Sequence, residues 1–140
     1  MLGGPRADAA RLQAEVEPHL ADVAAFDRWA RRLSLADSAF RSHEALEEAA
    51  FAPLRDDERV AAAWIVREGP DARELAYPAS APAQPEEGWV RIRSEALGEL
   101  DARRATLRLG REERECLLVR RSAPAPGGAT LHVTMAFAPR

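Results

Sequence analysis

The sequence predicts an α+β protein in which long N-terminal helices pack on one face of an antiparallel sheet of about five strands. Apolar residues recur at helical spacing over residues 1–58, whereas short alternating or continuous apolar runs follow over residues 59–140. Turn residues separate these runs closely, and strands joined by short turns pair most economically in antiparallel order. At 140 residues the chain is expected to form a single domain, with a helical part over 1–58 and a sheet over 59–140.

The first helical segment is expected from Arg6 to Leu33. Its apolar positions follow alternating steps of four and three residues, at Leu12, Val16, His19, Val23, Phe26, Ala30 and Leu33. Pro18 lacks a backbone donor, so it bends this helix or starts a second one. One interpretation of the stripe is an amphipathic helix laid on a sheet. The other is a seam for a second helix, which would make the protein a homodimer through its N-terminal helix.

A shorter helix is expected from His43 to Phe51. Ser42 precedes it and can cap its first turn, because a serine oxygen accepts a hydrogen bond from a free helical N–H group. Pro53 ends it.

The central feature of the sheet is a hairpin from Val60 to Pro78. Residues on both sides of its first strand are apolar, which indicates a strand covered on both faces. Gly69 to Ala72 supplies the turn, since Pro70 presets a turn conformation and Asp71 can bond its own backbone.

The rest of the chain is expected to be mostly extended. Residues 78–88, rich in proline and alanine, predict a long surface loop, and Trp89 to Arg93 alternates like a short strand. Ser94 to Leu100 fits either a helical turn or a loop. Two strands are predicted between Arg103 and Arg121, and a last one from Ala129 to Ala138.

Composition narrows the functional classes. The chain is 46% hydrophobic and 31% charged, as in soluble globular proteins. Its net charge of -3 is interleaved along the chain, which argues against a nucleic-acid partner. All 20 basic residues are arginine, which we attribute to a GC-rich genome. Cys116 is the only cysteine, so no disulfide within the chain is possible, and no apolar run is long enough to span a membrane.

No motif indicates catalysis, a cofactor or a metal. His19, His43 and His132 lack metal-ligand spacing, and Cys116 lies in an apolar run where a thiol is usually inert. The serines stand in no nucleophile-elbow motif. We therefore expect a protein that is not an enzyme.

The hairpin AWIVREGPDARELAYP and the last strand ATLHVTMAFAP resemble those of Cache domains, the PAS-like extracytoplasmic sensor domains of bacterial two-component sensor kinases. The resemblance implies a PAS-like sheet and a non-catalytic, ligand- or signal-sensing input domain. It also implies membrane helices flanking this segment in the full-length protein, and a periplasmic location on an inner-membrane histidine kinase. The alternative is a cytoplasmic dimeric interaction or adaptor module.

In a PAS-like sheet the ligand lies between the sheet and the crossover segment. The candidate ligand-binding residues are therefore Trp64, Tyr77, Trp89, Arg91 and Arg93. Aromatic side chains with one or two arginines suit a small anionic ligand, because guanidinium matches carboxylate geometry. The alternative is that the tryptophans fill the core and both arginines are solvated.

Overall fold

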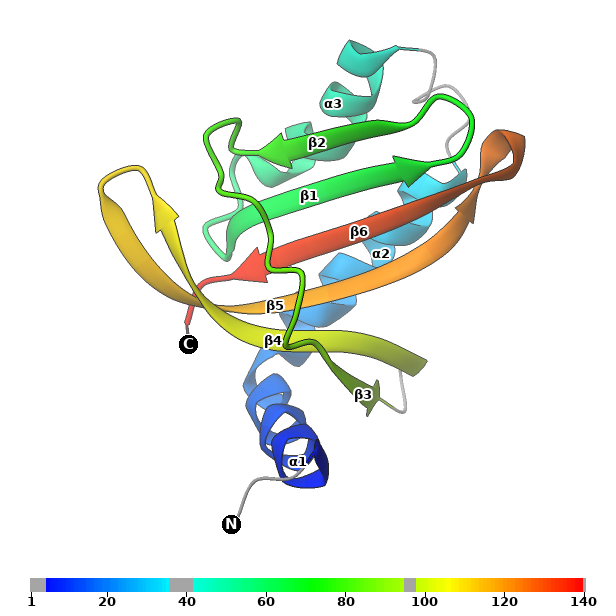
Figure 1. Cartoon of the computed structure of the whole chain (residues 1–140). Helices are drawn as coiled ribbons and strands as arrows, with labels where there is room; N and C mark the ends of the chain where they lie inside the picture. Colours follow the sequence, from blue (N-terminus) through cyan, green and yellow to red (C-terminus); the bar gives the residue numbers. More distant parts are fainter. Residues whose placement is uncertain (1–4, 36–41, 95–97, 140) are drawn as a thin grey trace.

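The computed structural model describes residues 5–35, 42–94 and 98–139. Its described part contains one open antiparallel sheet of six strands in the order β2-β1-β6-β5-β4-β3 (Figure 1). The elements are α1 (Pro5–Val16), α2 (Leu20–Leu35), α3 (His43–Phe51), β1 (Val60–Glu68), β2 (Arg73–Tyr77), β3 (Val90–Ser94), β4 (Gly98–Leu109), β5 (Glu112–Ala125) and β6 (Ala129–Phe137). The α+β class and the antiparallel sheet are confirmed, but the sheet has six strands and not about five.

The helical region breaks where the sequence predicts. A 3-10 turn at Glu17–His19 separates α1 from α2, and Pro18 lies inside that turn. At the start of α3 the Ser42 hydroxyl oxygen accepts a 3.0 Å hydrogen bond from the N–H of Ala45. No helix in the described ranges has both the length and the hydropathy needed to cross a membrane.

The two faces of the sheet have different coverings. In Figure 1, α2 crosses behind β5 and β6, whereas residues 78–89 run down the opposite side of the sheet from β2 to β3. We call these the helix-covered face and the loop-covered face. The main core lies on the helix-covered face, where Val23, Phe26 and Leu46 share one buried cluster with Ile65 and Phe137.

The apolar stripe of the N-terminal helices belongs to this core. Leu12, Val16, Val23, Phe26 and Leu33 are all buried within the same cluster as the sheet residues. They have the 3.6-residue spacing of an amphipathic helix that covers a sheet. A homodimer through these helices would therefore have to use other residues on them.

Two tryptophans fix the loop that crosses the loop-covered face. Trp64 donates its indole N–H to the carbonyl oxygen of Pro82 at 3.0 Å, and Trp89 donates to that of Pro85 at 2.9 Å. Trp64 also belongs to a small buried cluster beneath the loop, with neighbours that include Leu118. A proline-rich segment without regular structure is thus held against the sheet by side-chain donors.

The strand after β3 begins earlier than predicted. β4 starts at Gly98, whereas the sequence pattern placed a strand start at Arg103, and residues 95–97 lie outside the described residues. The apolar residues of β4 change from even positions, Leu100 and Ala102, to odd positions, Ala105 and Leu107, so the sequence shows no single continuous alternation; the polar positions of the first part are Glu99 and Asp101. Both face arginines of β3 across the strand pair, so opposite charges stabilise the pairing there.

Candidate functional site

The structure brings four of the five predicted site residues to one face. Trp64, Trp89, Arg91 and Arg93 lie on the loop-covered face or its edge, but Tyr77 does not. Tyr77 pairs with Ala63 in the β1–β2 register and packs against the Phe51 ring, with 5.6 Å between ring centroids. The placement of Tyr77 in the site is therefore wrong: strand alternation turns its side chain to the helix-covered face.

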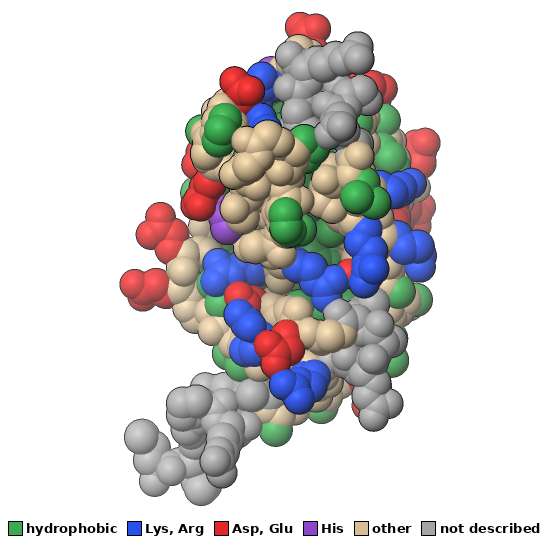
Figure 2. Space-filling model, turned by 90° about the vertical axis from the view of Figure 1, so that its right-hand side faces the viewer, with side chains coloured by type: hydrophobic (Ala, Val, Ile, Leu, Met, Phe, Trp, Pro, Cys, Tyr) green, Lys and Arg blue, Asp and Glu red, His purple; other side chains and the backbone are tan. Residues whose placement is uncertain are grey.

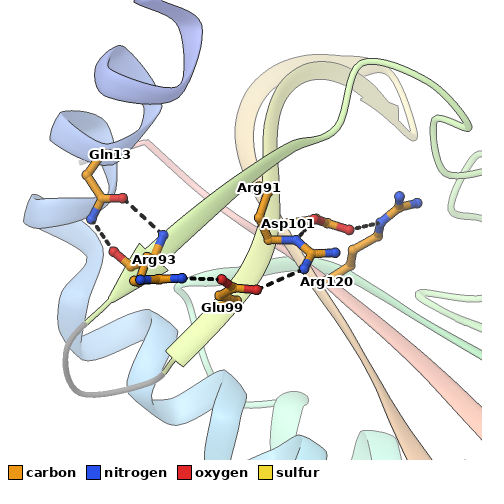
Figure 3. A network of polar contacts seen from close by, with 6 residues as sticks. All are labelled: Gln13, Arg91, Arg93, Glu99, Asp101 and Arg120. Atoms are coloured by element: carbon orange, nitrogen blue, oxygen red, sulfur yellow. Dashed lines mark hydrogen bonds and ion pairs between the residues drawn. The ribbon is translucent and has the colours of Figure 1, made fainter. Parts of the chain in front are cut away.

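Arg91 and Arg93 form ion pairs on the surface of the β3–β4 edge (Figure 3). Arg91 donates to Asp101 at 2.7 Å and to Glu99 at 3.2 Å, and Arg93 donates to Glu99 at 2.6 Å. The Arg93 side chain is 79% exposed and that of Arg91 is 63% exposed. The alternative of solvated arginines thus describes Arg93 well.

The pKa shifts in this group follow from these bonds. The hydrogen bonds from Arg93 and then from Arg91 lower the pKa of Glu99 from its usual range. The hydrogen bond to Asp101 and the charge of that carboxylate raise the pKa of Arg91, with Glu99 adding to the effect. Glu99 and Arg91 are therefore charged at neutral pH.

Arg120 on β5 is the site residue that the sequence prediction missed. Its Nε donates to Asp101 at 3.2 Å, and its guanidinium carbon lies 4.2 Å from the centroid of the Trp89 ring. These two contacts orient the guanidinium, whose side chain is 37% exposed. Within the described residues, no hydrogen bond or ion pair involves either of its terminal nitrogens. A fixed guanidinium with two free donor nitrogens is suited to bind an anion.

Arg120 is connected to the two predicted arginines. Ion pairs connect the following charged residues in one series, which we call the charged chain and which can be followed in Figure 3: Arg120, Asp101, Arg91, Glu99 and Arg93. At its far end the main chain of Arg93 is bound by Gln13 of α1. Gln13 donates to the Arg93 carbonyl oxygen at 2.7 Å and accepts from its N–H at 3.3 Å.

Two hollows lie on the loop-covered face, and Arg120 lines both. The first, which we call the polar hollow, has a volume of about 560 Å³. It is lined by Val66, Glu68, Gln84, Arg91, Glu99, Leu100, Asp101, Arg120, Arg121, Ser122, His132 and Thr134. The second, of about 750 Å³, lies under the loop beside Trp64, Ala76 and Pro82. Figure 2 shows a belt of basic side chains, with acidic ones beside it, across the end of the molecule seen at the right of Figure 1.

Side chains with hydroxyl, amide and imidazole groups line another part of the polar hollow. Thr134 donates to Gln84 at 2.7 Å. The Ser122 hydroxyl lies 2.5 Å from Nδ1 of His132, and Nε2 of His132 lies 3.1 Å from a carboxylate oxygen of Glu68.

The serine and the cysteine on the loop-covered face of β5 lack the surroundings of an activated nucleophile. Ser122 lies within a strand and not at the strand-to-helix turn that exposes a nucleophile and supplies oxyanion-hole donors. Burial raises the pKa of the Cys116 thiol, which makes it a weak nucleophile. Among the residues that the structure describes, no group of three or more histidine, cysteine or acidic side chains could hold a metal ion.

One signal in the sequence points to Arg120. Cys116, Leu118, Arg120 and Ser122 alternate along β5, so they share the loop-covered face. The continuous apolar run that ends at Val119 obscures this alternation, because it predicts burial on both faces of the strand and gives no sign that Arg120 lies on the same face as Leu118.

Comparison of the chain with protein-family models, with curated proteins and with solved structures found no match. The function of the site therefore has to be inferred from its geometry.

Proposed function

We propose that the chain is a signal-input domain that binds a small carboxylate or similar anion in the polar hollow. The observation that carries the proposal is the guanidinium of Arg120, which Asp101 and Trp89 hold in place while its two terminal nitrogens have no partner among the residues that the structure describes. Holding a group in its binding geometry lowers the entropy lost when a ligand binds. A carboxylate matches the two parallel N–H groups that such a guanidinium presents.

The charged chain supplies a route from the ligand to α1. An anion on Arg120 competes with Asp101 for the guanidinium, which would strengthen the contact between Asp101 and Arg91. The next contacts run to Arg93, whose main chain is bound by Gln13 of α1. Ligand binding can change the position of α1 only if the anion binds one arrangement of these contacts better than another.

We further propose that this input domain belongs to a membrane-bound sensor kinase and lies in the periplasm. The support is the resemblance of the hairpin and the last strand to Cache domains. A second support is the antiparallel sheet, because the polar hollow on its loop-covered face has room for a ligand. The full-length gene product decides this part: apolar spans on both sides of the segment and a kinase core are expected. A full-length product without them would favour the cytoplasmic adaptor.

The ligand proposal is tested with thermal-shift measurements and calorimetry using acetate and propionate. We expect Arg120→Ala to lose about 2 kcal/mol of binding free energy, the low end for a charge pair, because the side chain is 37% exposed. Arg93→Ala is the matched control, since Arg93 lies in the same charged chain but lines neither hollow. If no carboxylate stabilises the wild-type protein, or both variants bind equally well, the proposal fails.

We retain a homodimer through the N-terminal helices as a proposal. Leu20 and Leu35 of α2 are the large hydrophobic side chains exposed in the described part of the chain, at 47% and 82%. Sedimentation at high micromolar concentration tests it, with Leu20→Asp expected to weaken any dimer. A chain that stays monomeric at that concentration rules it out for the isolated domain.

A further inference from the structure

Most of the residues that line the polar hollow have polar side chains. Of its twelve lining residues, only Val66 and Leu100 are apolar. The others carry hydroxyl, amide, imidazole, guanidinium or carboxylate groups. A ligand that filled this space with hydrocarbon would remove those groups from water without replacing their hydrogen bonds, which is costly.

The polar groups form two rows that run across the strands, and each row contains one residue of β5 and one of β6. Arg120 of β5 lies opposite Thr134 of β6, and Ser122 lies opposite His132 two residues further along. Because residues two apart on a strand are separated by about 7 Å, the second row lies about that far from the guanidinium. Gln84 from the loop joins the first row through its contact with Thr134.

The second row contains an unsatisfied atom. Nε2 of His132 is covered from solvent, yet it has no well-directed hydrogen bond, although a Glu68 oxygen lies 3.1 Å away. Glu68 itself is mostly exposed, so its carboxylate can move. A ligand hydroxyl placed between them could bond to Nε2 of His132 and donate to Glu68, which would satisfy both groups.

We propose that the ligand of the polar hollow is a hydroxylated monocarboxylate of the sugar-acid class. The inference rests on the proposed function, because the carboxylate is the group bound by Arg120. The hydroxyl groups along the carbon chain reach Thr134 and Gln84 first, and Ser122, His132 and Glu68 about 7 Å further on.

The same groups disfavour three related classes of ligand. An unsubstituted carboxylate leaves the second row without partners. A neutral polyol has no charge for Arg120. A second carboxylate at the far end of the ligand would face Glu68, and those of Glu99 and Asp101 line the same hollow, so like charges oppose it.

A series of six-carbon compounds tests the inference by isothermal titration calorimetry at neutral pH and low salt. Gluconate carries the carboxylate and the hydroxyls, hexanoate lacks the hydroxyls, sorbitol lacks the carboxylate, and glucarate carries a second carboxylate. We expect hexanoate, sorbitol and glucarate each to bind at least tenfold more weakly than gluconate.

Single substitutions test the contribution of each row to ligand affinity separately. Ser122→Ala and His132→Ala are expected to weaken gluconate about tenfold and to leave hexanoate unchanged, whereas Arg120→Ala weakens both acids. Ser80→Ala is the matched control, because Ser80 is exposed on the loop and lines neither hollow. If a variant fails to fold, the ligand series on the wild-type protein still decides the question.

The outcomes distinguish the inference from the proposed function. If hexanoate binds as tightly as gluconate and Arg120→Ala weakens both, the inference is overturned and the proposed function stands. If sorbitol binds as tightly as gluconate and Arg120→Ala changes neither affinity, both are overturned. If none of these compounds binds and acetate also fails, neither survives.

Discussion

Replacing Gln13 by glutamate should destabilise the protein at neutral pH and should do so less at acidic pH. The Gln13 amide acts as a short substitute for a neighbouring strand at the edge of β3: it donates to the carbonyl oxygen of Arg93 and accepts from its N–H. A carboxylate can accept from the N–H but cannot donate to the carbonyl. Its second oxygen would face another acceptor at about the 2.7 Å that now separates Nε2 of Gln13 from that carbonyl.

The expected magnitude follows from two exposed hydrogen bonds. Each contributes about 0.5–1.5 kcal/mol net, so Gln13→Ala should cost about 1 kcal/mol, since water can bind the released groups. Gln13→Glu should cost at least as much at pH 7. The facing carbonyl stabilises the protonated carboxyl, which raises its pKa in the folded state above the unfolded value of about 4.3. The restored bond is therefore fully present below the unfolded pKa and is lost as pH rises through the folded one.

Urea unfolding of both variants at pH 7 and near pH 4 measures this effect. The Gln13→Ala protein serves as the reference, because the pH dependence of all other groups is common to both. Gln13→Glu should be the less stable of the two at pH 7 and should match or exceed Gln13→Ala near pH 4. A stability difference that does not change with pH would refute the account of the β3 edge.

Three further predictions concern the core, the thiol and the loop. Phe26→Ala should lower the free energy of unfolding by about 3–5 kcal/mol in urea titrations, because the ring is fully buried against the sheet. Cys116 should resist iodoacetamide in the folded protein and react only after unfolding, since burial raises its pKa; rapid alkylation of the native state would contradict this. Trp64→Phe should make residues 78–89 more sensitive to limited proteolysis, because the bond to the Pro82 carbonyl is lost; an unchanged cleavage rate would mean that other contacts hold the loop.

The sequence predicted correctly the elements in which the spacing of apolar residues agrees with the residues that begin or end an element, such as proline, serine and glycine. The helix break at Pro18, the cap at Ser42 and the hairpin turn at Gly69–Ala72 depend on local backbone chemistry, which a sequence displays directly. The early start of β4 was missed because Glu99 and Asp101 are stabilised by charges on β3, a contact between strands that the pattern of one strand does not reveal.

The site was predicted only in part for a similar reason. Trp64 and Trp89 were identified from residue type, but Tyr77 was assigned without following its alternation relative to Trp64. Alternation along β5 places Arg120 on one face with Leu118, but its partners Asp101 and Trp89 are known only once the strand order is known. Strand order is a tertiary property, and the sequence pattern alone does not fix it.

The most direct test of the central claim is the response of the arginine side chains to an anion. Two-dimensional ¹H–¹⁵N spectra of the Nε–H groups can be recorded while sodium acetate is added, with sodium chloride at equal ionic strength as the control. The account predicts a saturable shift that is largest for Arg120, smaller for Arg91 and smallest for Arg93, with all shifts lost in Arg120→Ala. Equal shifts at Arg93 and Arg120, reproduced by chloride, would mean that the hollow has no specific anion site and would contradict the account.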